Sequence, residues 1–123
     1  MPTPPRKTTA RRATGDRFED AARAFLEARG MRLMRANFLC RHGEIDLVMR
    51  DGDMLVFVEV RYRRGASFGG ALASVTAAKR RRLVSAAHLW LAAHPRDAHR
   101  ACRFDVLAFQ GTEMTWVRGA FEA

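Results

Sequence analysis

The sequence predicts an α/β domain in which helices pack on a single mixed β-sheet. Segments with helical spacing alternate with segments typical of strands, in the order α-β-β-β-α-β-β. An Asp51-Gly52 pair between two apolar runs is a strong hairpin signal. The length of 123 residues suits one domain with its own core. We therefore expect a single domain over residues 14–123.

The first element is expected to be a helix from about Asp16 to Arg29. Its apolar side chains recur on one face, and Gly30 is a typical stop signal. Residues 1–13 are rich in Pro, Thr and Arg and have almost nothing to bury. We predict that they form a disordered basic arm.

Three strands should follow this helix. Residues 31–39 alternate roughly between apolar and polar side chains and fit a strand or an extended connector. Residues 44–50 and 54–61 are apolar runs on either side of the predicted turn. A basic, Gly-rich loop then covers residues 61–72.

The second half of the chain should contain a long helix and two more strands. Ser74 is a suitable N-cap for a helix that ends near Ala93, just before Pro95. Residues 103–110 and 113–121 are strand-like runs separated by a short polar turn.

Net charge sets the chain apart from an average globular protein. It has 22 Lys and Arg against 13 Asp and Glu, a formal net charge of +9, and nearly all the basic residues are arginine. This excess favours a polyanionic partner, nucleic acid first, although a solubilising surface also explains it. The sequence has neither a secretory signal nor an apolar run long enough for a membrane span. We expect a cytoplasmic protein that does not bind membranes.

The predicted hairpin strands carry carboxylates among apolar residues. Glu44, Asp46 and Glu59 lie in runs of Ile, Leu, Val and Phe. Burying an ionised carboxylate is costly unless it is paired or binds a metal. For Asp46 and Glu59 we predict a divalent-metal site. For Glu44, at the start of its strand, we favour an ion pair with one of the many arginines.

Strand register decides whether Asp46 and Glu59 meet. A two-residue turn at Asp51-Gly52 places Asp46 diagonal to Glu59 on one face, and regular alternation puts Glu44 on that face as well. A four-residue loop would set Asp46 directly opposite Glu59. A three-residue loop without a bulge would put the two acids on opposite faces. The metal hypothesis therefore requires that the numbers of paired residues have an odd sum.

An Asp on one strand, followed on the next by Glu-x-Lys, is the PD-(D/E)xK signature of restriction-endonuclease-like nucleases, which this hairpin resembles. A closer resemblance is to the YraN-like family of small bacterial proteins with an endonuclease-like fold. It rests on GEIDLV, LVFVEV, Phe68-Gly69 in the Gly-rich loop, Lys79 and the terminal RFDV. The resemblance covers residues 15–108.

This resemblance implies that Asp46 and Glu59 ligate a metal, with the carbonyl of Val60 as a third ligand. The implied chemistry is phosphodiester hydrolysis. We expect nucleic acid as the partner and favour DNA, and the sequence leaves the choice between DNA and RNA open. Oxygen ligands suit Mg²⁺ or Mn²⁺, which would activate water and offset charge on the scissile phosphate. Nucleases of this kind often dimerise to cut both strands, which leaves a homodimer open.

Arg61 stands where the nuclease signature has lysine. Arginine stays protonated and cannot act as a general base, although it can neutralise a phosphate or stabilise a transition state. Lys79 is a candidate substitute because a helical wheel places it towards the inward face of its helix; the alternative is snorkelling to the rim. Arg63, Arg64 and Lys79 are candidate contacts to nucleic-acid phosphates.

Two further acids have competing interpretations. Glu19 stands where related nucleases often carry a supporting acid, which makes it a candidate catalytic residue. However, Asp16-x-x-Glu19 also has the spacing of a capping box, an interpretation that we favour. Asp105, in the RFDV run, is expected to pair with an arginine rather than to ligate a metal.

Three functions fit these observations. A metal-dependent nuclease acting on DNA agrees with the hairpin acids, the charge and the resemblance. A nucleic-acid-binding protein that kept the fold without turnover agrees with Arg61. A protein-interaction module with structural ion pairs explains the arginines but not the acids inside apolar strands. Whether the chain is an enzyme stays open at this point.

Overall fold

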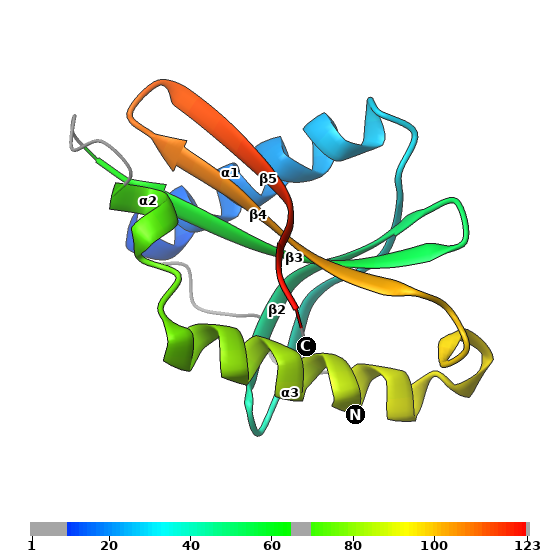
Figure 1. The fold of residues 1–123 in the computed structure, drawn as a ribbon. Helices are drawn as coiled ribbons and strands as arrows, with labels where there is room; N and C mark the ends of the chain where they lie inside the picture. Colours follow the sequence, from blue (N-terminus) through cyan, green and yellow to red (C-terminus); the bar gives the residue numbers. More distant parts are fainter. Residues whose placement is uncertain (1–9, 65–69, 123) are drawn as a thin grey trace.

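Helices cover both faces of a five-stranded mixed sheet in the computed structural model, which describes residues 10–64 and 70–122 (Figure 1). In chain order the elements are α1 (Ala10–Glu27), β1 (Arg32–Cys40), β2 (Gly43–Asp51), β3 (Met54–Arg63), α2 (Gly70–Ala73), α3 (Ala77–Ala93), the 3-10 helix η1 (Pro95–Asp97), β4 (Cys102–Gln110) and β5 (Glu113–Phe121). The strands lie in sequence order, with β3 and β4 parallel and all other neighbours antiparallel. The predicted α/β class and the order of its main elements are confirmed.

Helix α1 begins earlier than the sequence indicated. It starts at Ala10 instead of Asp16, so the end of the predicted basic arm belongs to the helix. The rest of that arm, residues 1–9, lies outside the described residues. In the part of the chain that is described, no helix is both long and apolar enough to cross a membrane.

Helix α3 begins later than predicted. Its N-cap is Thr76, whose hydroxyl oxygen accepts a hydrogen bond from the Lys79 backbone N–H at 3.3 Å. Ser74, the predicted cap, instead lies just after α2, and its hydroxyl donates to the Ala71 carbonyl at 2.5 Å. This frees the Ser74 oxygen for a contact described below.

The sheet has one apolar cluster under each long helix, and a smaller third cluster includes Ala71 of α2. The buried residues under α1 are Ala22, Leu26, Met31, Leu47, Met49, Val56, Val58 and Leu107. The buried residues under α3 are Ile45, Val48, Leu55, Phe57, Leu83, Ala86, Ala87, Trp90 and Phe104. Strand β3 supplies both clusters by regular alternation, which explains its nearly continuous apolar sequence. Each fully buried Leu or Phe stabilises the fold by about 1.5–3 kcal/mol.

The hairpin of β2 and β3 turns one residue later than predicted. Asp51 pairs with Met54, so the turn residues are Gly52 and Asp53, and Gly52 adopts a φ of +60°. Asp51 is thus the last residue of β2. The paired numbers still have an odd sum, as the metal hypothesis requires. This register aligns Asp46 with Glu59 directly instead of diagonally.

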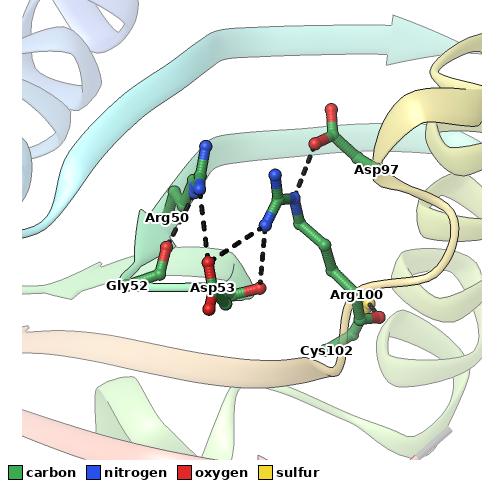
Figure 2. Close-up of polar contacts among 6 residues, drawn as sticks. All are labelled: Arg50, Gly52, Asp53, Asp97, Arg100 and Cys102. Carbon is green, nitrogen blue, oxygen red and sulfur yellow. Dashed lines mark hydrogen bonds and ion pairs between the residues drawn. The ribbon is translucent and has the colours of Figure 1, made fainter.

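Ion pairs tie this turn to the segment that enters β4 (Figure 2). Arg100 Nε lies 2.7 Å from Asp97 Oδ1, and Arg100 NH1 lies 3.4 Å from Asp53 Oδ1. From the other side, Arg50 Nε donates to the Gly52 carbonyl at 2.7 Å. The side chain of Asp53 is 97% exposed, so its pairs contribute little to stability. The Arg100–Asp97 pair, in contrast, is largely shielded from solvent, so part of the arginine excess has a structural use.

Candidate metal centre

The candidate site lies where β2 and β3 stop pairing. Leu47 and Val58 form the last ladder pair at this end of the hairpin. Beyond them, the Val60 backbone N–H donates to Asp46 Oδ2 at 2.8 Å, so a side chain takes the place of a backbone acceptor. Because the N–H and C=O of a strand residue point to the same side, the Val60 carbonyl also faces this gap. Asp46 is fixed at the mouth of the gap.

At Asn37 in β1 and Asp46 in β2, the two faces of each strand exchange sides of the sheet. We call this position the step. The pairs that flank this step are Ala36–Leu47 and Phe38–Ile45. The first pair packs on the α1 side of the sheet and the second on the α3 side, whereas regular alternation would keep both on one face. Asn37 has a φ of +53°, a left-handed conformation that Asn adopts more readily than most residues. The step breaks the predicted alternation of β2, and Glu44 faces α1.

Three carboxylates meet at this step, Glu19 from α1 and Glu44 and Asp46 from β2. Each offers one oxygen, and these oxygens lie within 4.8 Å of one another. The Asn37 amide is assigned with its nitrogen towards the acids, because its oxygen would otherwise face only acceptors. In this orientation it donates to Glu19 Oε2 at 2.9 Å and to Glu44 Oε1 at 2.8 Å. The three half-buried acids form a cluster that could hold a metal ion.

Glu59, which follows the last paired residue of β3, has basic neighbours. Arg61 NH1 lies 3.3 Å from Glu59 Oε1, and Arg61 Nε donates to Ser74 Oγ at 2.9 Å. The charge of Lys79, from the first turn of α3, also acts on Glu59. The site therefore has an acidic half beside α1 and a basic half beside α3.

Crowding and burial raise the pKa values of three of these acids. Burial, followed by the charges of Asp46 and Glu44, raises the pKa of Glu19 from 4.5 to about 8. Burial and the charge of Glu59 raise the pKa of Asp46 well above its usual range. Burial also raises the pKa of Glu59, against the opposing effect of Arg61. A bound cation would reverse these shifts because its charge favours the carboxylate form.

Lys79 has the opposite shift. Burial and the charge of Arg61 lower its pKa, whereas Glu59 acts to raise it. The charges of Arg63 and Arg82 lower it further. A lysine with a lowered pKa loses a proton more readily than an arginine does.

The structure brings most of the predicted site residues together. Asp46, Glu59, Arg61 and Lys79 share the gap region, whereas Arg63 and Arg64 are exposed at the end of β3. The Gly-rich loop with Phe68-Gly69 lies outside the described residues.

Two interpretations of single acids are wrong. Glu19 cannot cap α1, because the helix begins at Ala10 and Glu19 lies well inside it. Glu44 has no arginine partner among the residues that the structure describes, and lies with Asn37 and Glu19 instead. Asn37 was missed by sequence reasoning; its one signal is that it is a residue tolerant of left-handed backbone in an otherwise strand-like run.

Asp105 was correctly predicted as an arginine partner. It is fully buried and accepts hydrogen bonds from Arg103 Nε at 3.0 Å, Trp116 Nε1 at 3.0 Å and the Gly119 backbone N–H at 3.0 Å. These contacts join β4 to β5. Asp105 is a structural residue outside the acidic cluster.

The family is decided by sequence comparison. The model of the family described as "Uncharacterised protein family UPF0102" matches residues 18–109. The chain belongs to this family. A UPF0102 protein of Enterobacter sp. (strain 638) is 50% identical over 113 residues, which cover 91% of this chain and 86% of that protein. The protein YraN of Salmonella arizonae is 54% identical over 117 residues, 94% of this chain and 88% of its own length. YraN of Escherichia coli (strain SMS-3-5 / SECEC) is 52% identical over 118 residues, with shares of 95% and 89%.

Proposed function

We propose that this chain is a metal-dependent nuclease that hydrolyses phosphodiester bonds in DNA. The observation that carries the proposal is the gap between β2 and β3, where Asp46 accepts a hydrogen bond from the Val60 backbone N–H and lies close enough to Glu59 for the two charges to interact. Its donor set consists of oxygen atoms, which suits Mg²⁺ or Mn²⁺. The arrangement also agrees with the resemblance of the hairpin to the PD-(D/E)xK signature.

The residues of the gap fit a divalent ion. Asp46 would hold it together with Glu59 and the Val60 carbonyl, and Glu19 and Glu44 lie within reach of the same carboxylate. When bound, Mg²⁺ or Mn²⁺ supplies water activation and offsets charge on the scissile phosphate. The raised pKa values of Glu19 and Asp46 agree with a cluster that is completed by a cation.

The basic half of the site has two roles in this proposal. Arg61 faces the phosphate and stabilises the charge that develops on it. Lys79 Nζ, whose pKa is lowered, accepts in its neutral form the proton of the attacking water, which an arginine cannot do. Arg63 and Arg64, at the exposed end of β3, bind flanking phosphates of the DNA.

A second candidate function is nucleic-acid binding without turnover, and one observation favours it. Arg61 is held at both ends, by Glu59 and by Ser74. Its guanidinium offsets the negative charge of Glu59 that would attract an ion, and it cannot act as a base. A protein in which Arg61 stays paired with Glu59 still binds phosphates but does not cleave the nucleic acid.

A cleavage panel with Mg²⁺ and with Mn²⁺ tests the proposal on duplex, single-stranded and branched DNA and on RNA. Asp46→Asn and Glu59→Gln should abolish metal-dependent cleavage while DNA binding is retained. Asp53→Asn is the matched control, since it removes an exposed carboxylate at the far end of the same hairpin.

The outcomes of this panel separate the candidate functions. Binding to DNA without cleavage under any of these conditions supports the second function. A failure to bind any nucleic acid at low salt, where phosphate contacts are strongest, excludes both. The protein-interaction module would then be the remaining candidate.

A further inference from the structure

We propose that Asn37 is the positioning residue that preforms the acidic cluster for a divalent cation. This inference rests on the metal centre of the proposed function, but not on nuclease activity. Two features of Asn37 carry it: the conformation of its backbone and the contacts of its amide.

The backbone of Asn37 sets the direction of Glu44. A non-glycine residue with positive φ in the middle of a strand is uncommon and costs conformational energy. At this residue the two faces of β1 exchange sides of the sheet, and the neighbouring part of β2 does the same. This exchange directs Glu44 to the α1 side, where Glu19 lies. Without it, regular alternation would send Glu44 to the α3 side of the sheet.

The amide of Asn37 then holds the two acids together. An amide nitrogen has two N–H donors. In the assigned orientation of the Asn37 amide, one serves Glu19 and the other serves Glu44, at 2.9 and 2.8 Å. Each carboxylate keeps further lone pairs for an ion. A neutral donor is suited to this position, because it offsets the repulsion of the acids without cancelling the charge that attracts a cation. An arginine at the same place would neutralise the cluster.

The substitution Asn37→Gly separates the amide from the backbone. Glycine adopts positive φ without steric cost, so the exchange of faces in β1 is retained while both hydrogen bonds are lost. The full-length protein is titrated with Mn²⁺ alone, followed by electron paramagnetic resonance of the free ion. The temperature of unfolding is measured without metal. We expect Mn²⁺ to bind about 10- to 100-fold more weakly, as is typical when a group that orients metal ligands is removed. The metal-free unfolding temperature should change little, because glycine relieves the strain of the positive φ at position 37 while the two hydrogen bonds are lost.

Leu39→Gly provides the control for chain flexibility. Leu39 lies in the same strand, pairs with Glu44 and has 65% of its surface exposed, and its apolar side chain donates no hydrogen bond. This change therefore adds flexibility without removing a hydrogen bond to the acids. Its Mn²⁺ affinity should match that of the wild type. An equal loss in Leu39→Gly would mean that strand flexibility, not the amide, sets the affinity, and the inference would be wrong.

Three other results would overturn it. Unchanged or tighter Mn²⁺ binding by Asn37→Gly would show that the amide does not preform the site. A large fall in metal-free stability would make Asn37 a structural residue only. If the wild type binds no Mn²⁺, the metal centre itself fails and the inference fails with it. If the wild type and Asn37→Gly bind Mn²⁺ equally well, the inference about Asn37 fails while the proposed metal centre stands.

Discussion

At the residue scale, the buried Asp105 and the half-buried Asp46 show how environment separates structure from chemistry. Asp105 is surrounded by donors, from Arg103, Trp116 and a backbone N–H, and needs nothing more. Asp46 has one backbone donor and otherwise faces acids. A buried carboxylate with acidic neighbours is stable only when protonated or beside a cation. This contrast supports a role in chemistry for Asp46 and a structural one for Asp105.

The pKa of Glu19 predicts a pH dependence of metal-free stability. Its folded pKa of about 8 lies above the ordinary 4.5, so the folded state binds the proton more tightly than the unfolded state. The stability gained in this way is complete below about pH 4.5 and is lost as the pH rises through about 8. Asp46 and Glu59 shift in the same direction. We expect the unfolding temperature without metal to fall between about pH 5 and pH 9.

Glu19→Gln should make this fall smaller, and Mg²⁺ should stabilise the wild type more at pH 9 than at pH 5, since the ion favours the ionised acids. Thermal unfolding across this pH range, with and without Mg²⁺, measures both effects. A metal-free stability that rises over the range, with an equal rise in Glu19→Gln, would contradict the prediction.

Arg61→Lys tests the departure from the nuclease signature. Lysine cannot hold both Glu59 and Ser74 as the guanidinium does, and it can lose a proton. We expect a cleavage rate up to about 100-fold higher, the lower end of the contribution of a positioned base. Single-turnover cleavage with Mg²⁺ is the measurement. Arg61→Gln is the control, and it should not gain activity. A rate in Arg61→Lys at or below that of the wild type would mean that position 61 requires the guanidinium and that a second base beside Lys79 adds nothing.

At the element scale, apolar patterning predicted the strands well and the start of each helix poorly. The runs at 44–50, 54–61, 103–110 and 113–121 all lie in strands, because each contributes side chains to a buried face. Helix starts depend on local capping. Thr76 caps α3 while Ser74 is held by Arg61, a contact between segments that the sequence does not display.

The gap was only partly predictable for a similar reason. Parity along two strands was enough to bring Asp46 and Glu59 together. The position of Glu19 depends on how α1 packs across the sheet, and the position of Glu44 depends on a left-handed residue in β1. Both are tertiary effects, and periodicity along one strand contains no information about either.

The contacts of Asp105 predict that it is a main support of the β4–β5 pair. Asp105→Asn leaves Arg103 with one acid partner, Asp51, and removes the fully buried one. We expect a loss of about 3 kcal/mol, typical of breaking a buried ion pair. Asp53→Asn, which removes an exposed acid, should cost less than about 1 kcal/mol. Urea unfolding of the two variants measures the difference, and similar stabilities would show that the Asp105 pair contributes no more than a surface pair.

At the scale of the whole molecule, the arginines fall into two groups. Some are used internally: Arg100 binds the β2–β3 turn and Arg103 binds Asp105. Others surround the gap, where Arg61, Arg63 and Arg82 are close enough to lower the pKa of Lys79. Like charges at one place are unfavourable unless an anion binds between them. The arginines beside the acidic cluster therefore say more about where an anion binds than the net charge of +9 does.

The dependence of DNA binding on salt tests whether this position matters. Each phosphate contact lowers the slope of log K against log salt by about 0.9, because counterions are released from the DNA. The double variant Arg63→Gln/Arg64→Gln should make the slope shallower by about 1.8 if both side chains contact phosphates. Arg23→Gln/Arg29→Gln removes the same charge from two exposed positions, one in α1 and one just after it, and is the matched control. Binding of a fluorescent duplex is measured at several salt concentrations in Ca²⁺, chosen to limit cleavage. Equal changes in the two double variants would mean that only total charge attracts DNA, and that the end of β3 is not part of a specific surface.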